Sequence, residues 1–299
     1  MKITISGASG LIGRRLVKRL RDRGDDVTVL TRDPARGQSL GVPAVAWDPS
    51  AGPAPASALA GRDAVVHLAG ENVAQRWTDD AKQRIRRSRE LGTRNLVAGL
   101  AAADPAPRVL LSASAVGIYG GHGDERVPES TPPGHGFLAE VCVAWEREAR
   151  AAAERGTRVV LVRTGVVLDA EGGALGRMLP FFKLGVGGPV AGGRQYLPWI
   201  HADDVTGIYL TALDDDEWDG PVNATAPEPV TNRDFSHALG RALRRPAFAP
   251  VPALAIRTLY GEMAEIVTEG QRAVPERTQA LGYTFAHPQL DEALRSALR

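Results

Sequence analysis

The first twenty residues constrain the fold more than any other stretch. The segment "KITISGASGLIGRRLVKRL" opens with a short apolar run, passes through Gly7-x-x-Gly10-x-x-Gly13, and continues with apolar residues at helical spacing. Glycines in these positions allow a tight turn, close approach of the backbone to a pyrophosphate, and close helix–strand packing. A strand, this turn and a helix in succession predict a dinucleotide-binding unit, rather than a glycine turn with only a structural role.

Short apolar runs and longer amphipathic segments alternate through the first half of the chain. This rhythm is typical of an α/β fold, in which a parallel sheet is covered by helices. The predicted strands lie near Lys2–Ser6, Asp26–Thr31, Ala64–Leu68, Arg108–Ser112 and Arg158–Arg163. The predicted helices are Leu11–Arg23, Asp79–Ala103 and Gly136–Glu154.

The second half has a different texture, because glycine pairs break it into short pieces after about Arg163. The unit "WIHADDVTGIYLTAL" predicts a strand and helix that return to the core, with Asp203 or Asp204 as the helix cap. Thr231-x-x-Asp234 resembles a capping box at the start of a later helix. We therefore expect a cofactor-binding domain at 1–165 and about 198–226, and a small discontinuous C-terminal lobe for substrate at about 166–197 and 227–299.

Composition excludes several classes of function. The 299 residues are 43% apolar and carry a formal net charge of +1, so a nucleic acid or an anionic membrane is not an expected partner. A single cysteine, Cys142, excludes an internal disulfide framework and a cysteine-based metal site, and we predict no metal. No leader pattern and no run near 18 apolar residues is present, which favours the cytoplasm. Oligomeric state is not predictable from these features.

The end of the second strand bears on the choice of cofactor. It finishes in Thr31-Arg32 rather than in an acidic residue that would accept a hydrogen bond from the 2′-hydroxyl of the adenosine ribose. An arginine there favours NADP(H), because its planar fork pairs with a 2′-phosphate; alternatively, Arg32 and Asp33 only solvate the strand end. "AVVHLAG" places small residues where a cofactor could cross the sheet edge, with His67 as a packed core residue. The predicted cofactor contacts are Gly7, Ser9, Gly10, Leu11, Ile12, Gly13, Thr31, Arg32, Leu68, Ala69 and Gly70.

These and later motifs resemble the extended short-chain dehydrogenase/reductases. More narrowly, the chain is similar to the atypical epimerase family proteins, the nucleoside-diphosphate-sugar epimerase group. The motifs are "SGASGLIG", "HLAGENVAQRWT", "SASAVGIYG", "FLAEVCVAWE", "VRTGVVLDAEGGAL", "WIHADDV", "NATAPEPVTNRDF" and "GQRAVPERTQALGYTF". The resemblance implies a doubly wound NADP(H)-binding Rossmann domain with a small C-terminal lobe, and a sugar nucleotide as one possible small-molecule substrate.

The resemblance also implies a catalytic Tyr-x-x-x-Lys pair that this chain lacks. In ordinary members the Lys lowers the pKa of the Tyr phenol so that it exchanges a proton near neutral pH. Aligned on Glu146, the two positions fall on Leu138 and Cys142, and "FLAEVCVAWE" contains neither Tyr nor Lys. Leu138, Cys142, Trp145 and Ala149 form one helical stripe. We interpret it as packing or as an apolar pocket wall; a redox-sensitive thiol at Cys142 is the alternative.

Three residues are candidates for the catalytic roles. Ser114 is the best match for the Ser/Thr that the resemblance places on a substrate oxygen, with Ser112 as the alternative. Tyr119 could reach a substrate from the following loop as a donor. Glu71 follows Gly70 beside the predicted nicotinamide edge and could exchange a proton. "SASA" could also be only a tight strand end made of small residues.

Six further residues are candidates for substrate contacts. Arginine and amide groups bind anionic or hydroxyl-rich ligands, tryptophan offers a flat apolar face for a sugar, and histidine titrates in the useful range. Each also has a structural interpretation as an ion-paired, core or surface residue. The candidates are Arg76, Trp77, Arg163, Gln195, Trp199 and His201.

Two hypotheses for function follow. The first is an NADP(H)-dependent oxidoreductase or nucleotide-sugar epimerase that works without the usual pair. The second is a non-catalytic NADP(H)-binding protein with a regulatory or sensor role, since fold alone does not decide function.

Overall fold

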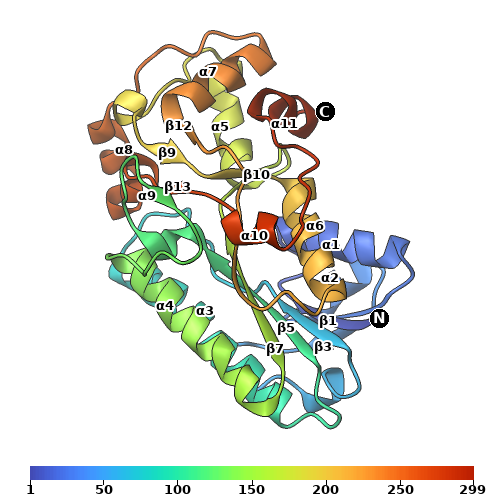
Figure 1. Ribbon diagram of the computed structural model, residues 1–299. Helices are drawn as coiled ribbons and strands as arrows, with labels where there is room; N and C mark the ends of the chain where they lie inside the picture. The colour runs from blue at the N-terminus through green and yellow to red at the C-terminus, as the bar shows by residue number, and fades with distance from the viewer.

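A seven-stranded parallel sheet forms the centre of the protein (Figure 1). The computed structural model describes the backbone of residues 1–299 and every side chain except those of Arg36, Ala255, Leu259 and Tyr260. The strand order is β11-β7-β5-β4-β1-β2-β3. The strands are β1 (Lys2–Ser6), β2 (Asp26–Thr31), β3 (Ala44–Ala46), β4 (Ala64–His67), β5 (Val109–Ala115), β7 (Arg158–Thr164) and β11 (Gly220–Ala224).

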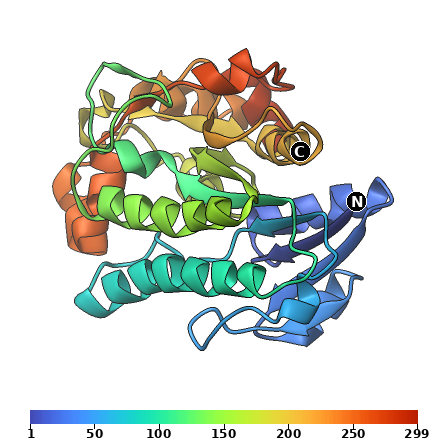
Figure 2. The same ribbon diagram turned by 60° about the horizontal axis from the view of Figure 1, so that its bottom comes forward.

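Helices cover both faces of this sheet, which is why its strands are almost continuously apolar. Ile5 and Val66 pack with residues of α1 (Leu11–Asp22) and α6 (Ala202–Asp214) in one core cluster. Val65, Leu110 and Leu161 pack on the opposite face with α3 (Asp79–Ala101) and α4 (Phe137–Arg150), which run side by side in Figure 2. The fold is therefore the predicted doubly wound α/β sheet.

The strand order fixes where a ligand can bind. From β1 the chain moves first to β2 and β3 on one side and then to β4 and β5 on the other. In open parallel sheets, this reversal leaves a crevice outside the carboxyl ends of the strands, where ligands bind. The crevice here lies between β1 and β4.

A second, smaller core lies beyond the sheet, at the top of Figure 1. It joins α5 (Gly173–Lys183), α7 (Asn232–Leu243) and α11 (Leu290–Ala297) through residues such as Leu179, Phe235 and Leu294. None of the helices that the structure describes is long and apolar enough to cross a membrane.

The remaining elements are three strand pairs and four short helices. The strand pairs are β8 (Val166–Leu168) with β10 (Trp199–His201), β9 (Tyr196–Leu197) with β12 (Val230–Thr231) and β6 (Arg126–Val127) with β13 (Arg272–Ala273). The helices are α2 (Pro34–Ser39), α8 (Ala253–Tyr260), α9 (Glu265–Thr268) and α10 (Glu276–Ala280).

Most of the predicted elements of the first half are confirmed. β1 and β2 have the predicted bounds, whereas β5 runs three residues past the predicted end at Ser112. The predicted helix at 136–154 is α4 followed by a 3₁₀ turn. The strand in "WIHADD" is β10, which pairs with β8 rather than joining the main sheet, and β11 takes the edge position instead.

The predicted cap of α6 is wrong. Neither Asp203 nor Asp204 is the N-cap, because β10 continues through His201 and the helix starts at Ala202. His201 takes the N-cap position, and its Nδ1 accepts from Asp203 N at 3.1 Å. The predicted cap of α7 is confirmed, since Thr231 Oγ1 accepts from Asp234 N at 3.2 Å.

Candidate functional site

A cavity of about 380 Å³ opens at the crevice between β1 and β4. It is lined by residues from the glycine turn, the end of β2, α2 and the segments after β3 and β4. Of the predicted cofactor residues, Leu11, Ile12 and Gly13 are not in its lining. Those that line it are Gly7, Ser9, Gly10, Thr31, Arg32, Leu68, Ala69 and Gly70.

The glycine turn has the shape that a pyrophosphate requires. Gly7 has φ +72°, and a Cβ there would stand 2.5 Å from the carbonyl carbon of Leu68. A Cβ on Gly13 would stand 2.5 Å from Gly7 O, so this residue lets α1 pack close to the turn instead of lining the cavity. Gly10 is the N-cap of α1 and offers no side-chain cap. The first N–H groups of α1 therefore stay free for an anion.

Arg32 stands at the β2 end of the cavity. Its side chain is exposed and has no hydrogen bond or ion pair within the described part of the chain. The neighbouring Asp33 is the N-cap of α2, where its carboxylate accepts from Ala35 N at 3.1 Å. A hydrogen bond from Ser50 N–H lowers the pKa of Asp48, and the Arg32 charge contributes to this shift. The site thus presents an unpaired cation where the strand ends.

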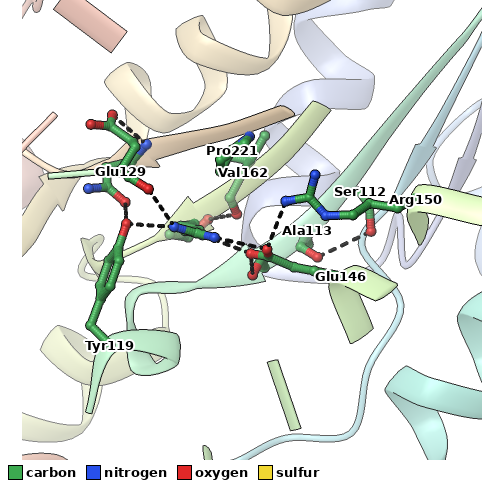
Figure 3. A network of polar contacts seen from close by, with 12 residues as sticks. Ser112, Ala113, Tyr119, Glu129, Glu146, Arg150, Val162 and Pro221 are labelled. Atoms are coloured by element: carbon green, nitrogen blue, oxygen red, sulfur yellow. Dashed lines mark hydrogen bonds and ion pairs between the residues drawn. The ribbon is translucent and has the colours of Figure 1, made fainter. Parts of the chain in front are cut away.

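Ser114 and Tyr119 lie in a buried polar network and do not line the cavity. Figure 3 shows Tyr119 and Glu146 in this network. Ser114 Oγ donates to Glu146 Oε1 at 2.7 Å. Arg163 donates to both carboxylate oxygens of Glu146, at 2.8 and 3.0 Å. Tyr119 Oη accepts from Arg163 at 2.9 Å and donates to Asn223 Oδ1 at 2.7 Å. Ser114, Tyr119 and Arg163 are thus paired within this network and do not line the cavity, and their contacts with a substrate stay a prediction.

This network also reaches the C-terminal segment. Asn223 N donates to Glu129 Oε1 at 2.9 Å, and the other oxygen of Glu129 accepts from Arg277 N at 3.0 Å. Burial raises the pKa of the Tyr119 phenol to about 12. Such a phenol stays protonated near neutral pH and is poorly suited to act as a base.

The two tryptophans, which the sequence predicts as platforms for a sugar, are packed inside the protein. Trp199 is fully buried in the smaller core, and its Nε1 donates to Glu228 O. Trp77 is 7% exposed and packs edge-on against Phe137, 5.0 Å between ring centroids. Neither ring offers a free face to a ligand.

The other substrate candidates make structural contacts. Arg76 donates to Thr258 O at 3.1 Å, and Gln195 Nε2 donates to the carbonyls of Val190 and Val267. His201, besides capping α6, lies against His287 with 3.9 Å between ring centroids. These two rings and Asp203 offer possible metal-ligating atoms within 4.8 Å of one another, but the Nδ1 of His201 already accepts the cap hydrogen bond.

The stripe on α4 packs inside the protein, as one of the interpretations predicts. Cys142 is buried in a cluster with Val116 and Ile118, and Leu138 packs against the backbone of Gly117. Burial raises the pKa of the Cys142 thiol to about 12, which keeps it protonated and unreactive. The arrangement does not favour a redox-sensitive thiol.

Glu71 lies just beyond the cavity, and with it Arg89, a residue that the sequence interpretation missed. Glu71 is partly exposed, and its Oε1 accepts from Gln75 at 3.2 Å. Arg89 Nη1 donates to Glu71 O at 3.0 Å. Arg89 follows Ile85 by four residues and precedes Leu96 by seven on α3, so it lies on the buried face of that helix. The sequence signal that could have identified Arg89 is a cation within an apolar helical stripe.

Comparison with known proteins agrees with this geometry. Residues 3–224 match the NAD dependent epimerase/dehydratase family, and residues 251–297 match a domain of unknown function. An epimerase family protein of Mycobacterium bovis is 43% identical over 295 residues, covering 98% of this chain and 96% of that protein.

Two solved structures are also similar. The crystal structure of human epimerase family protein SDR39U1 with NADPH has 35% identity and a TM-score of 0.89, and the match covers 100% of both chains. The nucleoside-diphosphate sugar epimerase from Corynebacterium glutamicum has 35% identity and a TM-score of 0.80, covering 100% of this chain and 58% of that one. The resemblance predicted from the sequence motifs is confirmed, and this chain belongs to the NAD dependent epimerase/dehydratase family.

Proposed function

We propose that this protein binds NADP(H) in the cavity between β1 and β4. The observation that carries the proposal is the pairing of an open glycine turn with the unpaired Arg32 at the β2 end of the same cavity. The turn fits a pyrophosphate, and an arginine with all its donors free fits a 2′-phosphate. The NADPH in the crystal structure of the human relative supports this choice of cofactor.

We further propose that the protein is an oxidoreductase or a nucleotide-sugar epimerase that works without the Tyr-x-x-x-Lys pair. A bound NADP(H) would supply hydride exchange, and the smaller lobe would hold a small polar substrate against it. The name of the Corynebacterium glutamicum relative supports a sugar nucleotide as that substrate. Glu71 is the candidate that remains partly exposed and ionisable beside Gly70, so we assign it the proton transfer.

One observation favours a second candidate function, a non-catalytic NADP(H)-binding regulator or sensor. Ser114 and Tyr119 are held in the internal network, and the α4 stripe offers Leu138 and a buried thiol. Fewer groups can therefore act on a substrate than in an ordinary member of this superfamily.

Binding measurements test the cofactor proposal. Titration should give tight binding of NADPH to the parent protein and about 10- to 100-fold weaker binding to Arg32→Ala, the usual range for a lost charged hydrogen bond. NADH affinity should not change. Arg108→Ala is the control, because Arg108 is 77% exposed and directly precedes the amino end of β5, whereas the cavity lies at the carboxyl ends of the strands. Equal NADPH affinity in Arg32→Ala and the parent would contradict our account of cofactor choice.

Turnover separates the two functions. A screen of carbonyl compounds and sugar nucleotides for NADPH oxidation should find a substrate, with activity lowered in Glu71→Gln while NADPH affinity is retained. Binding of NADPH without turnover of any substrate would favour the sensor. Full activity in Glu71→Gln would remove Glu71 from the mechanism.

A further inference from the structure

Arg89 is a cation held in a fixed position without an acidic partner. Its guanidinium lies 5.0 Å from the Trp145 ring centroid, and Nη1 donates to the carbonyls of Glu71 and Ile85. In the described part of the chain Arg89 makes no ion pair, and its Nε and Nη2 atoms have no hydrogen-bond partner. The contacts fix the side chain and leave most of its donors free.

The guanidinium lies beside Gly70, at the edge of the cofactor cavity, and Arg89 itself is not part of the cavity lining. A Cβ placed on Gly70, which lines the cavity, would stand 3.2 Å from Arg89 Cζ. Arg89 is also close enough to Cys142 on α4 for its charge to moderate the raised pKa of that thiol, which is near the backbone of Ala115 at the end of β5. Arg89 is thus on the β4–β5 side of the crevice, whereas Arg32 is on the β2 side. A dinucleotide that spanned the glycine turn would have its adenosine half near Arg32 and its other half near Arg89.

The free donors match the chemistry of that second half. Nicotinamide mononucleotide carries a phosphate and a ribose with two hydroxyl groups, all of which accept hydrogen bonds. The two other polar groups near Arg89 cannot bind the phosphate in its place. The Glu71 carboxylate would repel the phosphate, and the Cys142 thiol is buried. We propose that Arg89 binds the nicotinamide-mononucleotide half of NADP(H) through its phosphate and ribose oxygens. This inference rests on the proposed cofactor function and adds a residue that holds the reactive end of the cofactor.

Two ligands of different length test it. NADPH contains both halves, whereas 2′,5′-ADP carries the 2′-phosphate and ends before the nicotinamide half. Arg89→Gln should bind NADPH about 10- to 100-fold more weakly than the parent and bind 2′,5′-ADP equally well. Arg89→Lys should bind NADPH about three- to tenfold more weakly than the parent and bind 2′,5′-ADP equally well, because lysine keeps the charge but not the planar fork. Arg87→Gln, an exposed position on the same helix, should match the parent with both ligands.

The outcomes separate this inference from the cofactor proposal. An equal loss for both ligands in Arg89→Gln would show that the residue only supports the Gly70–Glu71 backbone, and no loss for NADPH would show that it does not bind the cofactor. Either result overturns the inference while the parent still binds 2′,5′-ADP. A parent that binds neither ligand would overturn the cofactor proposal as well. If circular dichroism shows that Arg89→Gln is unfolded, the same comparison of the two ligands is made with Arg89→Lys.

Discussion

Arg163 on β7 and Glu146 on α4 form a buried, two-pronged ion pair, with N–O distances of 2.8 and 3.0 Å. Their side chains are only 6% and 5% exposed. Burial alone would lower the pKa of the Arg163 guanidinium, but the hydrogen bonds that it donates to the Glu146 carboxylate raise it overall. Figure 3 shows how Tyr119 and Glu129 extend this pair toward the neighbouring elements. Ser114, Tyr119 and Arg163, which the sequence analysis predicts as substrate contacts, belong to a network that connects the sheet, α4 and the C-terminal segment.

Glu146→Gln should lower the free energy of unfolding by about 3 to 5 kcal/mol, because it leaves the Arg163 charge buried without its counter-ion. Denaturant titration followed by circular dichroism measures the change. Glu140→Gln is the control on the same helix, where a 63% exposed carboxylate pairs with Arg86; it should cost less than about 1 kcal/mol. Similar losses in the two variants would mean that the buried pair has no special role.

Ser114→Ala should change stability and leave the cofactor unaffected. The hydroxyl donates to the Glu146 carboxylate, and a hydrogen bond to a charged group contributes about 1.5 to 3 kcal/mol. The variant should lose that much stability and keep the NADPH affinity of the parent. Ser112→Ala is the matched control, because Ser112 donates only to the neutral Ala113 carbonyl. Weaker NADPH binding with unchanged stability would return Ser114 to a ligand-binding role.

The sheet and the glycine turn were predictable because their signals are local. Apolar runs bounded by turns define β1 and β2, and the crowding at Gly7 and Gly13 involves residues close in sequence or at the next strand end. β11 was missed because "GPVNA" contains Gly, Pro and Asn, which are unfavourable in strands. Its place at the edge comes from pairing with β7, a contact distant in sequence.

The orientations of site residues depended on tertiary structure. The predicted strand ends at Ser112, but β5 continues to Ala115, so the alternation of the strand fixes the direction of the Ser114 side chain. Leu110 and Ser114 share that face, which packs against α3 and α4 and brings the hydroxyl to Glu146. The partner lies 32 residues away in the sequence. No local pattern identifies such a partner.

Gly13→Ala should be destabilising although alanine favours helices over glycine by about 1 kcal/mol. The new methyl group would stand 2.5 Å from Gly7 O, so α1 must move away from the turn. We expect a net loss of about 1 to 3 kcal/mol and weaker NADPH binding, since the shift displaces the helix N-terminus. Gly52→Ala is the control, because no atom lies within 4 Å of its Cβ position. A variant as stable as the parent would mean that close packing at this position is not required.

His67 should make stability depend on pH. Its ring is fully buried between Ser6 and Thr93, and burial, aided by the Arg89 charge, lowers its pKa from 6.5 to about 4. Because the unfolded chain takes up this proton first as pH falls, the folded state loses stability between about pH 6.5 and pH 4. At about 1.36 kcal/mol per pH unit, this residue accounts for a loss of about 3 kcal/mol across that window.

Substitution isolates the contribution of His67 from that of the carboxylates. Urea unfolding of the parent and of His67→Gln at pH 7, 6, 5 and 4 should show a steeper loss of stability in the parent, whatever the difference between the two proteins at pH 7. His237→Gln, at an exposed position on α7, should follow the parent at every pH. If the His67→Gln curve runs parallel to that of the parent, the buried ring is not the source of the acid sensitivity.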